Sequence, residues 1–412
     1  MAQSTPSISI SRTFASLRHP NYRLWFLGQL VSLVGTWMQN TAQGYLIYEL
    51  TGSSLYLGLV SFAAGVPTWL FTLYGGVIAD RIPRRKLLMI TQTSAMLLAF
   101  IIAALVLTGI VQPWMILILA FFLGTVNAFE APVRISFVRE LVAEREDMPN
   151  AIALNATLFN AAATIGPAVG GLIYAAVGPG LCFTINGISF IAVLIALALM
   201  RIAAIPASPQ HVSAVSQLKE AFKYVRSEPA ILYLVIGTSF LSICGFGLFA
   251  LMPAWAKDVL GGDATTNGLL NSARGLGSMI GALLIATLSH LKRRGKMWAI
   301  GSYAMPLFIL LFSVTRLLPL SLLFLLGFGM SLMMIANINN ALIQMKVPDE
   351  LRGRVMSIYT LVFQGGFPIG SLLAGAAATQ FGEPAAIGMS AVLLLGFAVF
   401  TTFRRPEISR ME

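Results

Sequence analysis

The chain is divided into apolar runs that are each long enough to cross a lipid bilayer. A membrane-spanning helix needs about 20 mostly apolar residues. Twelve such runs cover residues 24–48, 54–79, 85–108, 113–133, 150–178, 181–201, 230–255, 266–290, 296–315, 319–345, 354–379 and 385–403. None of them alternates polar and apolar residues over about ten positions, as a barrel strand would. The sequence therefore predicts an all-α membrane protein with twelve transmembrane helices.

The positive charge of the chain follows the topology that these runs predict. The formal net charge is +11, with 27 Lys and Arg residues. With the N-terminus placed in the cytoplasm, all of them fall in cytoplasmic segments except Lys257, Arg316 and Arg274. Because cytoplasmic loops of membrane proteins carry an excess of Lys and Arg, the charge reports topology, with both termini cytoplasmic. No basic stretch interleaves with exposed aromatic residues, so we expect no nucleic-acid partner.

No enzyme, nucleotide or metal site is apparent. Cys182 and Cys244 fall in or beside predicted spans, so neither a disulfide framework nor a metal site follows. The chain has no G-x-x-x-x-G-K-[ST] loop for ATP. No cluster of acid, base and nucleophile lies deep in a span. We therefore expect a protein that is not an enzyme and that holds no cofactor.

The two halves of the chain resemble each other. A shift of 210 residues places Gly58 on Gly268 and Arg84 on Arg294. Parallel repeats of this kind are related by an axis along the membrane normal. The predicted units are an N-terminal six-helix half at 1–201, a cytoplasmic linker at 202–229 and a C-terminal six-helix half at 230–412. Apolar residues at helical spacing predict an amphipathic helix in the linker, either on the membrane interface or as a plain connector.

Polar side chains follow one face of the first predicted span. They recur every three or four residues and are Gln29, Ser32, Thr36, Gln39, Asn40 and Gln43. An amide that faces lipid without a partner costs several kcal/mol. The stripe must therefore face water, substrate or another helix. Hydrogen bonds between helices are one interpretation. Since the stripe runs along nearly the whole span, we favour a cavity.

Other spans offer side chains that would face the same cavity. Asn127 lies in the fourth span and Phe246 in the seventh, and the tenth span carries Met333, Asn337 and Asn340. Met and aromatic surfaces adapt to varied ligands. The sequence thus predicts a substrate site that is polar and nearly uncharged.

Arg274 is the basic residue placed well inside a predicted span. The helical rise puts it about 12 Å from the outer end of that span. Burying an arginine there costs roughly 2.5–3.5 kcal/mol on insertion scales. It shares a helical face with Asn267 and Asn271, which favours an inward orientation toward substrate or an anion. The alternative is snorkelling to the outer interface, beside a partner such as Glu49.

The carboxylates bear on energy coupling. Of the sixteen acidic residues, only Glu49, Asp80 and Glu130 fall near the membrane, and we place all three at its edges. A proton carrier at mid-bilayer is therefore not apparent in the sequence.

The loop after the second span is the densest motif in the chain. Residues 75–86 read GGVIADRIPRRK, and five of the twelve are charged. This loop resembles the G-x-x-x-D-R-x-G-R-[RK] motif of the major facilitator superfamily. The matching residues are Gly76, Asp80, Arg81, Arg84 and Arg85. Pro83 stands where the motif has Gly, so the turn must differ, because proline fixes φ near about −65°.

By analogy with that family, these residues imply a cytoplasmic latch between the two halves. Asp80 would face the N-terminus of the eleventh span, where a carboxylate gains about 0.3–1 kcal/mol from the helix dipole. Glu130, at the end of the fourth span, would pair with Arg84 or Arg85, and a role as proton carrier is the alternative. Plain topology anchoring is the alternative, and it explains the positive charges but not Asp80.

The fifth span carries a second motif of the family. It matches the G-P-x-x-G-G signature of the drug-antiporter branch at Gly166, Pro167, Gly170 and Gly171. Proline removes a backbone donor and glycine permits close helix approach, so we interpret the segment as a pivot or seal between the halves, or as tight packing. An arginine that is linked to proton coupling in relatives is missing, since Ala120 stands four residues before Gly124.

Three further segments resemble the transmembrane secretion effector branch, which includes the enterobactin exporter and macrolide efflux proteins. They are residues 24–52, 150–160 and 352–363. The resemblance implies a secondary efflux transporter in a bacterial inner membrane. It would act as a monomer and export a small amphipathic molecule, drug or siderophore-like, by alternating access and proton antiport. The alternatives are a metabolite uptake symporter or facilitator and a non-transporting membrane receptor.

Overall fold

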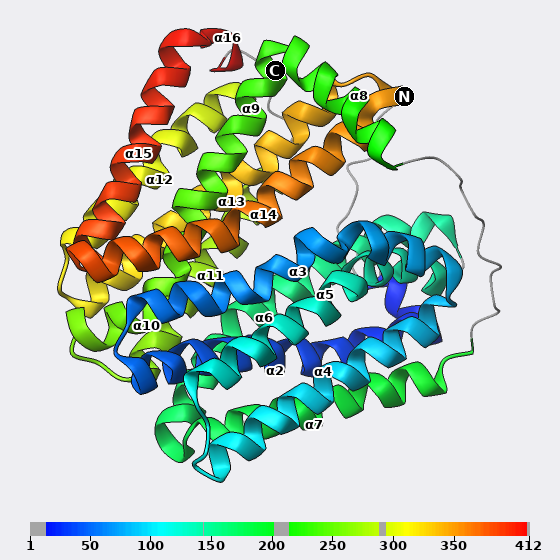
Figure 1. Ribbon diagram of the computed structural model, residues 1–412. Coiled ribbons are helices and arrows are strands. Elements are labelled where there is room, and N and C mark those ends of the chain that lie inside the picture. The colour runs from blue at the N-terminus through cyan, green and yellow to red at the C-terminus, as the bar shows by residue number, and fades with distance from the viewer. Residues whose placement is uncertain (1–13, 143, 202–213, 288–293, 410–412) are drawn as a thin grey trace, which may run out of the picture.

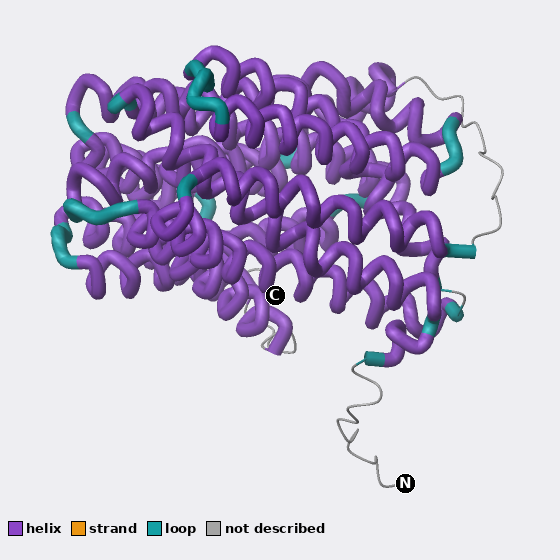
Figure 2. The backbone as a smooth tube through the Cα atoms, turned by 90° about the horizontal axis from the view of Figure 1, so that it is seen from below, coloured by secondary structure: helices purple, strands orange, loops and turns teal. Residues whose placement is uncertain are grey.

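The computed structural model describes residues 14–142, 144–201, 214–287 and 294–409, and this part of the chain is helical with short connections (Figure 2). Eleven of the described helices are long and apolar enough to cross a membrane. Another, α2, has 32 residues and carries the polar stripe. The predicted all-α class with twelve helices of spanning length is confirmed.

Two groups of helices follow one another along the chain. The first half consists of η1 (Ala15–Arg18), α2 (Pro20–Thr51), α3 (Ser54–Arg81), α4 (Arg84–Leu107), α5 (Pro113–Leu141), η2 (Arg145–Asp147), α6 (Met148–Val177) and α7 (Pro179–Leu199). The linker helix is α8 (Ala214–Ser227). The second half consists of α9 (Pro229–Phe240), η3 (Leu241–Gly245), η4 (Phe246–Leu251), α10 (Met252–Ala254), η5 (Trp255–Val259), α11 (Ala264–Thr287), α12 (Arg294–Val314), α13 (Leu318–Lys346), α14 (Asp349–Phe381), α15 (Glu383–Arg404) and α16 (Pro406–Ser409).

Glycine and proline end equivalent helices in the two halves. Gly178, where φ is 86°, caps the C-terminus of α6, and α7 begins at Pro179. Gly382, where φ is 81°, caps the C-terminus of α14, and Pro384 lies in the first turn of α15. Glycine adopts positive φ without a Cβ clash, and proline fits the first helical turn because its missing N–H needs no partner there.

Figure 1 shows how the two halves are arranged. α8 lies at one end of the helices and α10 at the other, and we call these the α8 end and the α10 end. The two halves converge at the α10 end and diverge toward the α8 end (Figure 1).

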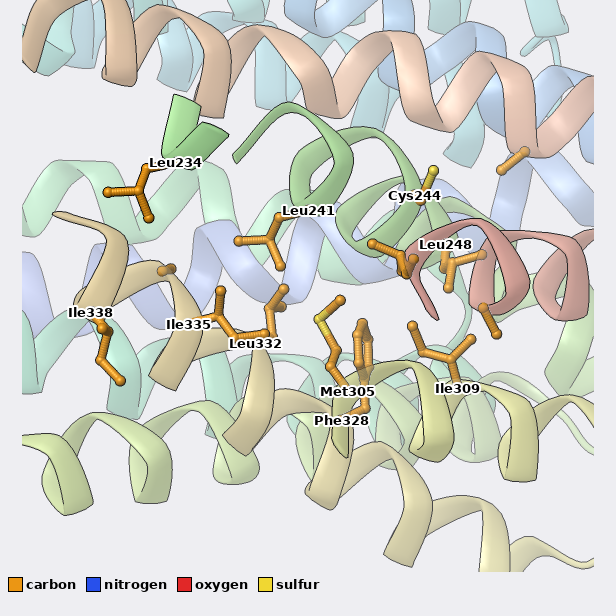
Figure 3. Packing of buried hydrophobic residues seen from close by; sticks show 14 of the residues in the cluster. Leu234, Leu241, Cys244, Leu248, Met305, Ile309, Phe328, Leu332, Ile335 and Ile338 are labelled. Atoms are coloured by element: carbon orange, nitrogen blue, oxygen red, sulfur yellow. The ribbon is translucent and has the colours of Figure 1, made fainter. Parts of the chain in front are cut away.

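Each half packs around buried apolar residues of its own. One cluster lies within residues 221–394, and Leu241, Leu248, Met305 and Phe328 converge in it (Figure 3). Another lies within residues 22–200. A third cluster joins residues of the first half to two small residues of the second, Ala254 and Ala264. Most of the apolar packing is therefore internal to a half.

Small residues let the halves approach each other closely. Where α6 crosses α11, a Cβ added to Gly171 would lie 2.4 Å from the carbonyl oxygen of Ala264. Where α3 crosses α14, a Cβ added to Gly58 would lie 2.6 Å from the carbonyl oxygen of Ser371. Membrane helices approach in this way because lipid supplies no hydrophobic drive for their association. Both crossings therefore depend on glycine.

The seventh predicted span is not one regular helix. After α9 the chain passes through a π-turn at η3, a 3₁₀ stretch at η4 and a second π-turn at η5. Pro253 lies in this segment and has no N–H to donate, while Gly247 contacts the backbone of Gly370 on α14. Irregular turns of this kind often mark functional sites within helices. Sequence periodicity alone did not reveal the break.

The linker helix α8 rests on the second half. Ala221 and Val225 are buried in the core of that half, and Arg354 of α14 pairs with Glu220. Phe222 is exposed on the other side of the helix. The rest of the linker, residues 202–213, lies outside the described part of the chain.

A leucine in place of Gly171 should act as a wedge at the α10 end. Over-packing costs about 1–3 kcal/mol, and about 1.4 kcal/mol already shifts an equilibrium tenfold. We expect spin labels at the exposed positions Ile110 and Lys257, one in each half, to lie farther apart in Gly171→Leu than in the parent. Double electron–electron resonance measures this distance.

Gly396→Leu is the matched control, because nothing lies within 4 Å of a Cβ built at that glycine. Its distance distribution should equal that of the parent. An unchanged distribution in Gly171→Leu would contradict a glycine-dependent closure.

Candidate functional site

A cavity of about 450 Å³ lies between the two halves. Helices α2, α3, α5 and α6 line it from the first half, and η4, α10, α11 and α14 line it from the second. Its polar lining residues are Asn40, Thr41, Gln43, Ser61, Asn127, Asn267, Asn271 and Arg274. Its aromatic lining residues are Trp37, Phe246, Phe249 and Phe367. The lining is thus amide-rich and aromatic, as a site for an amphipathic small molecule requires.

Five of the predicted substrate-binding residues line this cavity. They are Asn40, Gln43, Asn127, Phe246 and Arg274. Asn40 and Asn127 are both exposed although each lies in the middle of a long helix. The structure brings them together from α2 and α5, while Phe246 and Arg274 come from the second half.

The irregular turns of the second half place aromatic side chains in the cavity. In a 3₁₀ stretch, side chains three residues apart eclipse each other. Phe246 and Phe249 lie three apart in η4, and their rings meet edge to face with centroids 5.3 Å apart. The break that the sequence did not reveal therefore shapes one wall of the site.

Two predicted residues of the α2 stripe lie elsewhere. Gln39 is buried, and its Oε1 accepts a hydrogen bond of 2.7 Å from Nδ2 of Asn186 on α7. Gln29 is 2% exposed and lies about three turns from Asn40 toward the α8 end. Neither lines the cavity, so the stripe divides into a cavity face and a face that packs within the first half.

The predicted residues of α13 also lie away from the cavity. Met333, Asn337 and Asn340 are half-buried, and Asn340 accepts a hydrogen bond from Gln344. Their neighbour Asn339, which the sequence interpretation passed over, is 1% exposed. It accepts a bond from Trp298 and donates one to Thr238, which ties three helices together.

Several lining residues were not predicted from the sequence. Trp37 lies one turn before Asn40 and shares its face, and Ser61 and Phe367 line the cavity from α3 and α14. The sequence did hold a signal for such residues, because an apolar or aromatic residue one helical turn from a lining amide lies on the same face of its helix.

Arg274 points inward and does not pair with Glu49. Its guanidinium carbon lies 3.8 Å from the ring centroid of Phe249, and the residue is 9% exposed. Glu49 instead accepts a hydrogen bond from Tyr174. The snorkelling alternative is therefore not the observed arrangement.

The arginines of the predicted latch contact their own half. Arg84 pairs with Glu140 of α5, and an Nη of Arg85 donates to the carbonyl oxygen of Ala198 on α7. The side chains of the other latch residues lie outside the described part of the structure. These are Gly76, Asp80 and Arg81.

The expected pairing of Glu130 with Arg84 or Arg85 is wrong. α4 and α5 run antiparallel, so Glu140 lies opposite Arg84, and Glu130 lies two to three turns away beside Gln92. Among the described residues, the cation beside Glu130 is Arg134, whose Nη1 lies 3.8 Å from Oε1. Glu130 is 8% exposed, and α5 continues for about 16 Å beyond it. The carboxylate therefore lies deeper than its predicted place at the membrane edge.

The signature of α6 serves two interfaces. Gly166 and Gly170 face α2, since an added Cβ would lie 2.5 Å from Cβ of Trp37 and 2.9 Å from the carbonyl oxygen of Met38. Gly171 faces α11, and Pro167 lines the cavity. The segment thus reaches both the other half and the site.

Polar contacts join the halves near the α10 end. Tyr48 of α2 donates to Asp258 of η5, and Ser54 of α3 donates to Glu383 of α15 at 2.8 Å. Every ion pair among the described residues, by contrast, lies within one half or joins the linker to the second half. Among the described residues, these side-chain hydrogen bonds between the halves lie near the α10 end.

Comparison with known proteins places the whole chain among membrane transporters. The profile described as "Transmembrane secretion effector" matches residues 11–412. The staphyloferrin A transporter of Staphylococcus aureus is 25% identical over 363 residues, which cover 87% of this chain and 90% of the relative. Macrolide efflux protein A of Streptococcus pyogenes is 22% identical over 386 residues, covering 92% and 94%. The enterobactin exporter EntS of Shigella boydii is 25% identical over 398 residues, covering 96% and 94%.

Solved transporter structures share the fold. A bacterial homologue of the human lysosomal transporter Spinster, in an inward-facing and unoccupied conformation, has a TM-score of 0.73 at 14% identity and covers 98% of each chain. A POT family transporter in complex with 5-aminolevulinic acid has a TM-score of 0.77 at 10% identity, covering 94% and 96%. These relatives and neighbours are transporters, which confirms the expectation that the protein is not an enzyme.

Adjacent cysteine substitutions should distinguish the two faces of α2. Asn40 lines the cavity, whereas Gln39 bonds Asn186 in a closely packed contact. In a background without Cys182 and Cys244, we expect a hydrophilic maleimide to label Asn40→Cys rapidly and Gln39→Cys hardly at all. Mass spectrometry of the labelled protein measures both rates. Equal rates at the two positions would contradict the division of the stripe.

Proposed function

Because the chain belongs to the transmembrane secretion effector family and is a multi-pass membrane transporter, we propose that it exports a small amphipathic molecule by alternating access. The observation that carries this proposal is the cavity of about 450 Å³ lined by both halves. A site shared by two bodies can be exposed to one side of the membrane and then to the other when the bodies rock. Relatives named for staphyloferrin A, macrolides and enterobactin support a drug or siderophore-like substrate.

The arrangement of contacts supports a direction for the opening. We assign the α8 end to the cytoplasm of a bacterial inner membrane because the loops there carry nearly all of the Lys and Arg residues. Both termini would then be cytoplasmic. The Tyr48–Asp258 and Ser54–Glu383 contacts would close the outer side, and the site would load from the cytoplasm.

The opposite conformation needs contacts at the cytoplasmic side. We propose that Gly76, Asp80, Arg81, Arg84 and Arg85 supply them when the outer contacts open. Arg84 and Arg85 are the first two residues of α4. Movement of the second half toward the first would bring the N-terminus of α14 and its helix dipole toward this loop.

We propose the proton gradient as the drive and Glu130 as the group that carries the proton. A buried carboxylate in a spanning helix is rare and marks a functional site by default. Glu130 is the buried carboxylate among the described residues of the spanning helices. Arg134 and Gln92 lie beside it, so their interactions with Glu130 would change when the carboxylate gains or loses a proton.

Export is tested in inverted membrane vesicles with dansyl-phenylalaninamide, a neutral amphipathic compound, as the probe. Under the proposal, vesicles that contain the protein accumulate the probe when their interior is acidified, without ATP. We expect Asn127→Leu to reduce the initial rate, because it removes an exposed amide from the cavity wall. Accumulation only in right-side-out vesicles would identify an uptake carrier instead.

Replacement of Glu130 by glutamine should uncouple transport from the proton gradient. Glutamine cannot release a proton, so we expect Glu130→Gln to lose the response to an imposed pH gradient and to keep downhill exchange of the probe. Glu130→Asp should retain part of the response. Glu407→Gln, which changes an exposed carboxylate outside the spanning helices, is the control. A full pH response in Glu130→Gln would rule out this carrier.

A further inference from the structure

Arg274 is a buried cation in the wall of the cavity. The residue is 9% exposed, and among the described residues no carboxylate oxygen lies within 4 Å of its guanidinium. Its Nε is buried and has no hydrogen-bond partner there. One face of the guanidinium is held against the ring of Phe249. A buried charge is normally paired, so an unpaired one in a cavity wall calls for an anion from outside the chain.

The rest of the cavity wall does not supply that anion. The lining contains amides, hydroxyls and apolar groups, and Arg274 is its charged member among the described residues. The neighbouring amide of Asn271 donates both of its described hydrogen bonds to Asn267 and is not a counterion. The wall therefore carries one net positive charge in a region of low dielectric, where a charge acts strongly on a ligand.

We propose that the cavity selects amphipathic monoanions whose carboxylate binds Arg274. A single guanidinium balances one negative charge, whereas a phosphate dianion would leave charge uncompensated. The planar fork of arginine matches a carboxylate with two parallel hydrogen bonds. The apolar part of the ligand would pack on the aromatic wall that Phe246 and Phe249 provide. This inference rests on the proposed export function and names the substrate class for it.

The position of Arg274 fits this role on geometric grounds. It lies ten residues into α11, about 15 Å from the start of that helix at the α10 end. Its own backbone packs against Gly329 of α13, where an added Cβ would lie 2.2 Å from the carbonyl oxygen of Arg274. The fixed backbone and the stacked ring hold the guanidinium in place before a ligand arrives, which lowers the entropy lost on binding.

A matched pair of probes tests the inference on the purified full-length protein. Dansyl-phenylalanine carries a carboxylate, and dansyl-phenylalaninamide differs from it only by a neutral amide. Energy transfer from tryptophan reports binding, since Trp37 lines the cavity. We expect the wild type to bind the acid at least about tenfold more tightly than the amide, as for a hydrogen-bonded charged pair. Arg274→Met should abolish this preference without weakening binding of the amide, and Arg274→Lys should keep a smaller one.

Arg316→Met is the matched control, because Arg316 also lies over an aromatic ring, that of Trp255, but outside the cavity. It should retain the preference. A second readout needs no ligand: Arg274→Met should melt at a higher temperature than the wild type, because an apolar side chain replaces an unpaired buried cation. A lower melting temperature would instead indicate a structural arginine and overturn the inference.

Equal affinity for the two probes in the wild type, including no measurable binding of either, overturns the inference, as does a preference that survives in Arg274→Met. Export is scored separately with the neutral amide in inverted vesicles. Transport of the amide without discrimination keeps the export proposal and rejects the anion site. Preferential binding of the acid without transport of either probe keeps the anion site and rejects export.

Discussion

A polar group in a lipid-spanning helix must find a partner within the protein or face an internal cavity, and this constraint organises the whole structure. Gln39 meets Asn186, and Asn339 meets Trp298 and Thr238, so these amides fasten helices inside one half. Asn40, Asn127 and Arg274 instead line the central cavity. Packing and binding are thus two outcomes of one rule, applied to different faces of the same helices.

The interface between the halves combines contacts of two kinds. Glycines at the crossings of α6 with α11 and of α3 with α14 allow backbone contact without interlocked side chains. A few hydrogen bonds near the α10 end add specificity, while the ion pairs of the described residues remain within a half or tie the linker to one. The described interface therefore combines close backbone packing with a few polar side-chain bonds.

The irregular segment from η3 to η5 connects the fold to the site. Its π-turns and 3₁₀ turns break the regular helix beside α14, where Gly247 and Gly370 meet. The same turns align Phe246 and Phe249 on the cavity wall, and Phe249 in turn holds Arg274. Local backbone irregularity, aromatic lining and the buried cation therefore form one unit of the second half.

The sequence by itself determined the spans, because apolar length, glycine and proline act locally, although it did not reveal the break in the seventh span. It also determined that amides of α2, Asn127 and Arg274 needed an interior environment. Tertiary structure alone decided which neighbour each face met. Helical periodicity assigns a residue to a side of its own axis but fixes neither the partner helix nor the shift along it. That is why Asn40 and Gln39, adjacent in sequence, separate into cavity and packing, and why Glu130 lies beside Gln92 while Arg84 lies beside Glu140.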